Sequence, residues 1–490
     1  MKLIITEKPS VAQAYAKVLG VRNRQDGYLE GSGYIVSWCV GHLVELSEPE
    51  EYDSRYGKWR YGDLPILPEQ WGYRVMTPTL AMVVMREAAI RSFVPEPFYT
   101  VQLAADQLQI GGERMKERTQ AEEIVEKCRT AGTLTVTKVE QKERSEKPPL
   151  PYDLTGLQRD ANRILGYTAQ QTLDYAQALY EGKLITYPRT DSKYLTNDMG
   201  DMLPGLLQHI GAEFVIALDS ELCIDRILNS SGVSDHHAIL PTVTVTKKLI
   251  AELPAGQREI LRLIATRLCC SVGQPYRFAE TTVEAECAGS TFKTKSKTVA
   301  SRGWKQLWEA AYPPKKEKKE DYIPELKEGA VLTLSGVTLK EGQTTSPAHF
   351  TEDSLLQMME TAGAEAMPEN AERRGIGTPA TRAGIIEKLV QKGFVERVGD
   401  KKNRHLISTA KGDALITVVP EQIQSPSLTA DWEEKLLQVE HRQYDGGQFM
   451  SEIGDMVSGL VGSNELANEP GFVIEMRLEK ISISCCTEPS

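Results

Sequence analysis

The first residues of the chain pass from a short apolar run into a polar loop. Residues 2–6 predict a buried strand, and Ser10 with Gln13 forms the capping-box pattern that opens a helix. This order predicts a βα unit. Glu7 and Lys8 follow the carboxyl end of the strand, where open α/β sheets hold their ligands. A solvated acid at a helix N-terminus is the plainer interpretation of Glu7.

Polar and apolar residues alternate further along, at 99–103 and 134–139 and again at 281–295 and 331–339. A period of two is typical of half-buried strands. We interpret these stretches as one β-rich module, interrupted by an inserted helical module at about 151–240.

The inserted module carries a helix and then a tyrosine at a turn. Thr168 and Gln171 form a capping box, and Gly182 is a natural helix stop. After a short predicted strand, Tyr187 stands before Pro188, which cannot continue a strand ladder. The tyrosine is therefore predicted to be held at a rigid turn.

Tyr187 and Arg189 suggest nucleophilic chemistry on a phosphate. A phenol with a pKa of about 10 is a weak nucleophile at neutral pH and needs cationic partners. The planar guanidinium of Arg189, two residues on, matches phosphate oxygens. From the spacing alone, such a Tyr-Pro-Arg turn is more often structural than catalytic.

Two adjacent histidines precede an apolar segment of the same module. Neighbouring residues of an extended chain point to opposite faces, so His236 and His237 are not expected to bind one metal ion together. At most one of them faces a site, as a hydrogen-bond donor to a phosphate or as a proton carrier. A polar loop that leads into a strand is the alternative.

The last third contains a predicted helix and hairpin. Thr378 is a strong N-cap, Pro379 suits the first helical position, and the helix is predicted to continue through Leu389. Residues 394–398 and 405–408 flank a polar turn. A helix followed by a hairpin resembles a winged-helix unit.

Charge adds a possible partner for this region. The chain has 57 basic and 68 acidic residues and a net charge of −11, so a nucleic acid would have to meet a local basic surface. Residues 371–411 contain ten Lys and Arg against four Asp and Glu, a net charge of +6 that suits a phosphate backbone. A solvated helix face is the alternative.

Three function classes are excluded or disfavoured by what the sequence lacks. No run reaches the roughly 18 apolar residues of a membrane span, and we expect a cytoplasmic protein without a membrane partner. The eight cysteines form no C-x-x-C pair, so no zinc is expected. The P-loop pattern G-x-x-x-x-G-K-[ST] is absent, which excludes ATP hydrolysis at such a loop.

Five motifs occur along the chain in a fixed order: T-E-K-P-S at 6–10, P-L-P-Y-D-L at 149–154, I-T-Y-P-R-T-D-S at 185–192, D-H-H-A-I at 235–239 and G-I-G-T-P-A-T-R at 375–382. In these motifs and in their order the chain resembles the type IA DNA topoisomerases, most closely the bacterial topoisomerase III group, over residues 1 to about 460.

The resemblance implies a multidomain fold of α/β and α+β parts, arranged as a toroid. A partial Toprim domain is expected at 1–75, and an arched base with a winged-helix-like element at 76–98 and 345–460. A β-rich hinge is expected at 99–150 and 241–344, and a helical domain with the catalytic tyrosine at 151–240. Residues 461–490 form a C-terminal tail.

The resemblance also implies the chemistry. Tyr187 would attack single-stranded DNA and become linked to the 5′ phosphate, without ATP, so that negatively supercoiled DNA is relaxed or decatenated. Arg189 would orient the phosphate, His236 matches the active-site histidine, and Glu7 and Lys8 match the Toprim acid and lysine. The chain would act as a monomer. We also assign nucleic-acid contacts to Trp59, Arg74, Thr77, Gln158, Arg373, Arg374, Thr378, Thr381 and Arg382.

One departure from the family pattern concerns the metal. Toprim domains bind Mg²⁺ through the early glutamate and a later D-x-D motif, and no D-x-D occurs in the 490 residues, so the Mg²⁺ site around Glu7 is expected to be incomplete. Arg74 and Val75 run directly into the next family segment, as an internal deletion would leave them. A catalytically impaired DNA-binding remnant is therefore an alternative function. A winged-helix regulator would explain the basic segment but not the Tyr187 motif.

Overall fold

The structure is a computed structural model, and it describes only part of the chain. The described residues are 2–6, 21, 23–25, 28–31, 34–38, 77–314 except 107, 220 and 234, 323–362, 375–419, and short stretches between 424 and 456. Contacts group residues 1–77 with 435–475 in one unit, and 78–434 with 476–490 in a second. The residues predicted to form the base, 345–460, are therefore divided between the two units after residue 434. In the first unit, Lys435 Nζ forms an ion pair with Glu452 at 2.5 Å.

The N-terminal unit contains a four-stranded sheet in the order β1-β4-β3-β2. The strands are β1 (Lys2–Thr6), β2 (Asn23–Gln25), β3 (Tyr28–Gly31) and β4 (Tyr34–Trp38). β1 pairs with β4 in parallel, and the other pairs are antiparallel. The strand predicted at 2–6 is confirmed. The helix predicted after Ser10, with Glu7 and Lys8, lies outside the described residues.

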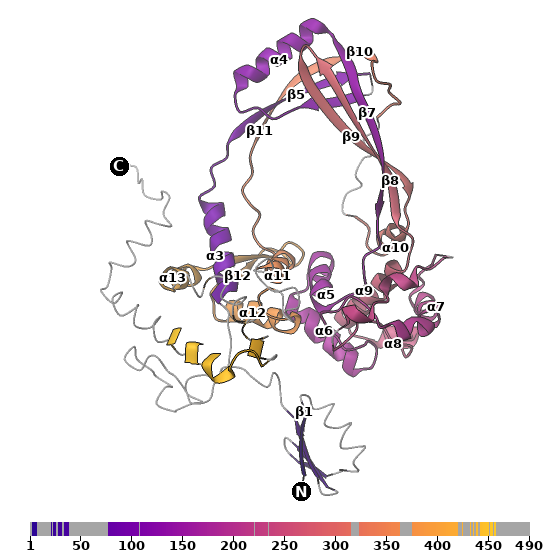
Figure 1. The fold of residues 1–490 in the computed structure, drawn as a ribbon, viewed down its shortest axis with the longest axis vertical. Helices are drawn as coiled ribbons and strands as arrows, with labels where there is room; N and C mark the ends of the chain where they lie inside the picture. The colour runs from indigo at the N-terminus through magenta and orange to yellow at the C-terminus, as the bar shows by residue number, and fades with distance from the viewer. Residues whose placement is uncertain are drawn as a thin grey trace, which may run out of the picture. The chain divides into compact units, whose positions relative to one another are not determined.

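A seven-stranded sheet forms one end of the second unit, and its order is β10-β7-β8-β9-β6-β5-β11 (Figure 1). Its strands are β5 (Pro97–Ala105), β6 (Leu108–Gly112), β7 (Thr133–Glu146), β8 (Tyr276–Cys287), β9 (Ser290–Ser301), β10 (Val331–Thr333) and β11 (Gly336–Gln343). Alternate residues of β5 are buried, as the period of two predicts. They share a core with helix α4 (Arg118–Ala131), so the β-rich module is confirmed.

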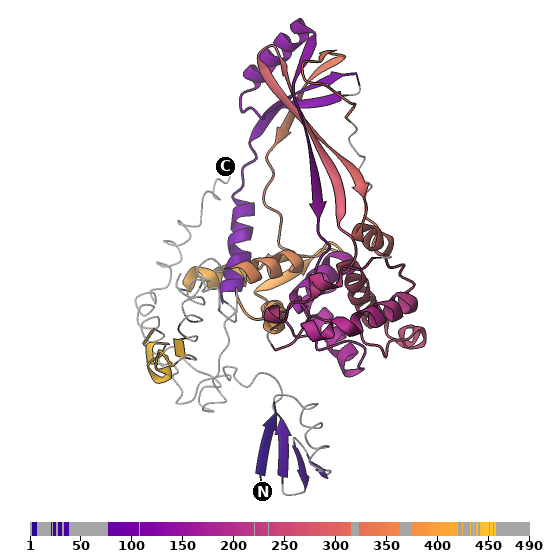
Figure 2. The ribbon, with the colours of Figure 1, turned by 45° about the vertical axis from the view of Figure 1, so that its right-hand side comes forward.

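The inserted helical module lies between the end of the long strand β7 and the start of β8, which pair with each other next to it (Figures 1 and 2). Its helices are α5 (Leu154–Asp160), a π-helical turn (Ala161–Leu165), α6 (Ala169–Glu181), α7 (Leu203–Phe214), α8 (Lys247–Glu252), α9 (Ala255–Ser271) and α10 (Trp304–Ala311), with 3₁₀ turns at Asn197–Met202, Ile224–Ile227 and Ser230–Gly232. The capping box of Thr168 with Gln171 is present, as predicted.

The predicted end of this module at residue 240 is wrong. Apolar residues of α9, namely Ile260, Leu263 and Leu268, are buried in the same core as Leu179 and Leu207. Because α9 belongs to that core, the helical module extends without a break to about residue 272 before the hinge strands resume at β8, and α10 packs against the same core after β9.

The base of the second unit consists of short helices and a hairpin. Its elements are α3 (Thr77–Arg91), α11 (Glu352–Thr361), α12 (Pro379–Gln391), β12 (Val395–Val398), β13 (His405–Ser408) and α13 (Ala410–Val418). The helix start at Thr378 and Pro379 and the hairpin that follows are confirmed. Arg91 pairs with Asp413 at 2.9 Å and so ties α3 to α13.

Polar contacts join the base to the helical module. The buried carboxylate of Glu352 accepts from the Ala169 backbone N–H at 2.5 Å, at the first residue of α6, and pairs with Arg397 at 2.8 Å. Burial raises the pKa of Glu352, and the charge of Arg397 opposes this. Arg159 pairs with Asp353 at 2.7 Å. A carboxylate at a helix N-terminus is favourable, so this contact fixes α6 and the chain that follows it.

None of the helices within the described ranges is long and apolar enough to cross a membrane.

Gly166 offers a test of the packing between the helical module and the base. Its φ is +71°, and a Cβ added there would clash with the Lys401 carbonyl group. Gly132 has a similar φ of +66° and open space around it. Left-handed strain costs about 1 kcal/mol for either alanine variant, but only Gly166→Ala adds the clash. In thermal unfolding we expect Gly166→Ala to lower the apparent Tm several degrees more than Gly132→Ala. Equal shifts would contradict the described contact.

Candidate functional site

Backbone hydrogen bonds fix the segment that carries Tyr187. After α6 and its C-cap Gly182, Ile185 forms an isolated bridge with Pro241, and the Thr186 N–H donates to the Leu240 carbonyl at 2.9 Å. The short strand expected at 184–186 is thus reduced to a bridge. Proline at 188 and at 241 removes two of the N–H donors that a regular ladder would need. Tyr187 directly follows these bonded residues, so the bridge fixes where its backbone begins.

The structure places His236 directly beside Tyr187. Their ring centroids are 4.2 Å apart, with the ring planes at 50°. The Thr190 hydroxyl donates to the His236 carbonyl at 2.7 Å and so holds the two segments together. His237 does not join them, since its Nδ1 lies 2.8 Å from the Ala238 carbonyl oxygen. The expectation that at most one histidine faces the tyrosine agrees with this geometry.

Arg189 is two residues beyond Tyr187, and its guanidinium is incompletely satisfied. Its Nε is buried and finds no hydrogen-bond partner among the described residues. A buried donor without an acceptor costs free energy, so an external acceptor such as a phosphate oxygen would be stabilised there. A partly exposed phenol, an imidazole and such a guanidinium can receive a phosphodiester.

A third segment, residues 152–154, is hydrogen-bonded both to the segment that carries Tyr187 and to the segment that carries His236, and we call it the support. The Ile239 N–H donates to the Tyr152 carbonyl at 2.8 Å, and the Leu154 N–H donates to the Thr190 carbonyl at 3.0 Å. Asp153 lies between these two bonds and caps α5 by accepting from the Gly156 N–H at 2.8 Å. Burial raises the pKa of Asp153 to about 6, opposed by the charge of Lys193 at 3.6 Å.

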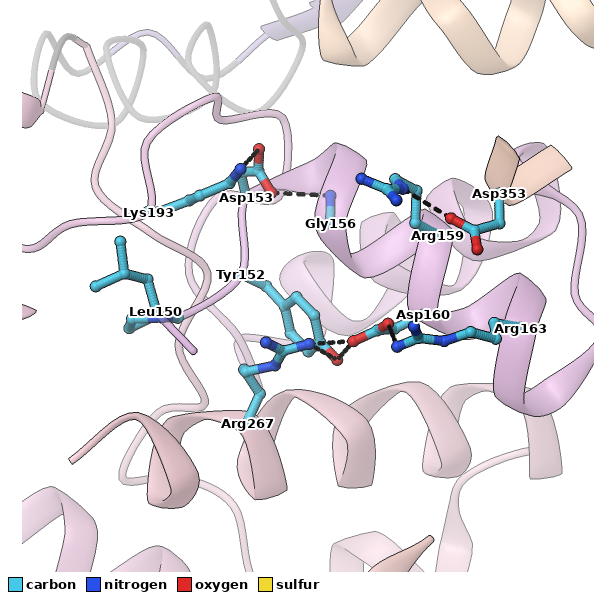
Figure 3. Close-up of a pocket in the computed structure, with 11 residues that line it drawn as sticks. Leu150, Tyr152, Asp153, Gly156, Arg159, Asp160, Arg163, Lys193, Arg267 and Asp353 are labelled. Atoms are coloured by element: carbon cyan, nitrogen blue, oxygen red, sulfur yellow. Dashed lines mark hydrogen bonds and ion pairs between the residues drawn. The ribbon is translucent and has the colours of Figure 1, made fainter. Parts of the chain in front are cut away.

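A pocket of about 310 Å³ opens next to this support (Figure 3). Among the side chains that line the pocket, Asp160 binds three others. The Tyr152 hydroxyl donates to it at 2.6 Å, and Arg163 and Arg267 both pair with it. The Arg267 guanidinium also lies over the Tyr152 ring, 4.3 Å from its centroid. Sequence reasoning missed this network, because Arg267 comes from α9, more than a hundred residues away, and no local motif marks it.

The residues of the base and of α5 that were predicted to contact DNA form hydrogen bonds within the protein. Thr378 and Thr381 cap α12 together, with the Thr378 N–H donating to the Thr381 hydroxyl at 2.8 Å. Arg382 is buried and donates to the Thr155 hydroxyl at 3.0 Å. Burial lowers the pKa of Arg382, and the charges of Glu360, Asp153 and Asp191 oppose this. Gln158 is also buried, with its Nε2 donating to the Ala169 carbonyl at 3.2 Å.

These four residues position protein segments, and their assignment as DNA contacts stays a prediction. Thr77 begins α3. The remaining predicted site residues lie outside the described residues: Glu7, Lys8, Trp59, Arg74, Arg373 and Arg374.

The described residues contain no group of three or more His, Cys, Asp or Glu side chains that could hold a metal ion. The Mg²⁺ expectation rests on Glu7, and the sequence has no D-x-D pair to complete a site of several carboxylates. Mg²⁺ prefers an octahedral oxygen shell and gives up its waters reluctantly. The part of the chain that the structure describes therefore offers no site for a tightly bound Mg²⁺.

Comparisons with known proteins define the class. A family model described as DNA topoisomerase matches residues 72–451. The chain belongs to the type IA bacterial DNA topoisomerases, a family of isomerases. DNA topoisomerase 3 of Bacillus licheniformis is 30% identical, over 95% of this chain and 82% of its own length. DNA topoisomerase 3 of Bacillus subtilis is also 30% identical, over 92% and 80%.

A solved structure supports the fold. Full-length topoisomerase I from Thermotoga maritima superposes with a TM-score of 0.60 and 24% identity, over 79% of this chain and 62% of that one. The resemblance found in the sequence is thus confirmed, and the comparisons favour a topoisomerase over an impaired remnant. The alignment with the B. licheniformis protein spans 605 positions, more than the 490 residues of this chain, so that relative has segments that this chain lacks.

Asp153 predicts a pH dependence of stability. Its pKa is about 6 in the folded protein and about 3.9 in an unfolded chain, so between these values the folded state binds more protons. Stability from this group is therefore present at low pH and is lost as pH rises through about 6. Lowering the pH from 7 to 5 should stabilise the native chain by about 1 kcal/mol relative to Asp153→Asn, which keeps the cap but does not titrate. Chemical denaturation of both proteins at both pH values measures this. Parallel pH profiles would contradict the assigned pKa.

Proposed function

We propose that this chain cleaves and rejoins single-stranded DNA through Tyr187. The observation that carries the proposal is the position of the Tyr187 ring beside His236, with a buried donor of Arg189 unsatisfied among the described residues two positions on. Family membership supports it, since Tyr187 lies in the motif that matches the family's tyrosine motif. ATP is not required, because the energy of the broken bond is kept in the new one.

The proposed step is a transfer of one phosphodiester bond. The Tyr187 oxygen attacks phosphorus and forms a new P–O bond while the bond from phosphorus to the 3′ oxygen breaks. The phenol gives up its proton, and the departing 3′ oxygen gains one. The DNA strand is then held on Tyr187 by its 5′ phosphate, and attack by the 3′ hydroxyl reverses the step. Arg189 neutralises and orients the phosphate, and His236 hydrogen-bonds to it or carries the proton.

Several finer assignments belong to this proposal. Residues 1–75 are a Toprim domain shortened internally, which fits both the missing D-x-D and the longer alignment with the B. licheniformis relative. Single-stranded regions of negatively supercoiled DNA are the substrate, and the protein acts as a monomer in the cytoplasm. The toroidal arrangement of the domains is part of the same proposal.

Replacing Tyr187 by phenylalanine tests the nucleophile. We expect Tyr187→Phe to abolish covalent adducts with a single-stranded oligonucleotide while its binding changes less than about twofold, because only the reacting oxygen is removed. Tyr180→Phe is a matched control, since the Tyr180 ring lies edge-on to Tyr187 with centroids 5.5 Å apart. Denaturing gels separate adducts from free protein. Adducts that persist in Tyr187→Phe would disprove the assignment.

A Mg²⁺ titration tests the expectation that this chain binds Mg²⁺ weakly. Without a D-x-D pair, Mg²⁺ should bind weakly, so supercoil relaxation should need at least about tenfold more Mg²⁺ for half of its maximum than DNA topoisomerase 3 of B. licheniformis measured in parallel. Plasmid relaxation across a Mg²⁺ titration compares the two enzymes. Equal requirements would show that other acids of this chain complete the site.

A further inference from the structure

We propose that the pocket around Asp160 is a second phosphate site, which holds the DNA strand that stays attached to Tyr187 after cleavage. This inference rests on the proposed function. The pocket is lined by Leu150, Pro151, Tyr152, Asp153, Gly156, Arg159, Asp160, Arg163, Lys193, Arg267 and Asp353.

The charges of the pocket favour an anion. Four cationic side chains line it, and three carboxylates balance them, so one positive charge is in excess. Arg159 pairs with Asp353 and Lys193 with Asp153, whereas Arg163 and Arg267 share the single carboxylate of Asp160 (Figure 3). The excess cation therefore lies at Asp160.

Arg267 supplies an unsatisfied donor at the same place. Its side chain is only 15% exposed, and its Nε is buried without a hydrogen-bond partner among the described residues. A phosphate oxygen could accept there, as in other arginine-phosphate pairs. Arg163, whose side chain is 61% exposed, adds a second guanidinium on the open side of Asp160. Leu150 and Pro151 add apolar atoms to the lining of the pocket.

The position of the pocket relative to Tyr187 indicates which phosphate it takes. The wall formed by Tyr152 and Asp153 is bonded on one side to Ile239 and on the other, through Leu154, to Thr190. Lys193 lies six residues after Tyr187 on the same segment. In the proposed reaction the strand with its 5′ phosphate on Tyr187 remains with this module. A phosphate site one segment away on the same support is suited to the next part of that strand.

The test measures the contribution of Arg163 to binding of a fluorescent oligothymidylate, in full-length protein carrying Tyr187→Phe so that no cleavage occurs. We expect Arg163→Gln to weaken binding about fivefold and to reduce the log–log salt slope by about 0.7, the value for one lost contact to a single strand. Arg163→Lys keeps the charge and should keep the slope. Arg118→Gln is the matched control, because Arg118 is 59% exposed and pairs with Glu122 in the β-rich module.

Each outcome decides between interpretations. Equal slopes for Arg163→Gln and Arg118→Gln, in protein with unchanged thermal unfolding, would show that the pocket is only a structural salt-bridge network. Thymidine 5′-monophosphate that binds at about millimolar concentration through Arg163 without displacing the oligonucleotide would assign the site to a free nucleotide instead of a strand. Adduct formation is measured separately, in protein with native Tyr187. A binding result that contradicts the pocket proposal therefore leaves the assignment of Tyr187 as nucleophile intact, and an absence of adducts contradicts that assignment independently of the pocket.

Discussion

The candidate site depends on a small set of backbone hydrogen bonds between three segments that are far apart in the sequence. The segment at 152–154 donates to and accepts from the two segments that carry Tyr187 and His236. The Thr190 hydroxyl adds a direct bond between those two. A tyrosine and a histidine on separate loops would be free to move apart, whereas here their rings are held 4.2 Å apart by bonds that require no ligand. Such preorganisation lowers the cost of binding a phosphate in a reactive position.

Buried carboxylates surround this support, and each has a cationic partner. Glu352 of the base is balanced by Arg397 and by the N-terminus of α6. Asp160 is shared by Arg163 and Arg267, and Asp153 faces Lys193. Removing one partner of such a pair leaves an uncompensated charge, which is strongly unfavourable. Between the helical module and the base, the Glu352 carboxylate at the N-terminus of α6 and the Arg159–Asp353 pair add electrostatic contacts to the apolar packing inside each.

Local patterns predicted the local structure well. The capping residues Thr168 and Thr378 start helices where expected, and the alternating stretches form the strands of one sheet. The boundary at residue 240 failed because α9 has no local feature that assigns it to one core or another; only its packing against α6 and α7 does so. For the same reason the pairing of Arg267 with Asp160 could not be foreseen, since it joins residues 107 positions apart.

Candidate site residues were predictable where a motif combined reactive side chains with a rigid backbone. Tyr187, Arg189 and His236 meet that condition, and the structure brings Tyr187 and His236 together. Gln158 and Arg382 show the limit of the same reasoning, because a polar or basic residue in a motif can equally be buried and bonded to protein. Burial depends on the tertiary fold, and no charge count along the sequence reports it.

The central claim is that one tyrosine oxygen carries the DNA. Peptide mass spectrometry of adducts trapped on a single-stranded oligonucleotide tests it most directly, by locating the modified residue and identifying the linked end of the DNA. We expect one modified peptide, with Tyr187 joined to a 5′ phosphate. Attachment at any other residue, or through a 3′ phosphate, would contradict it.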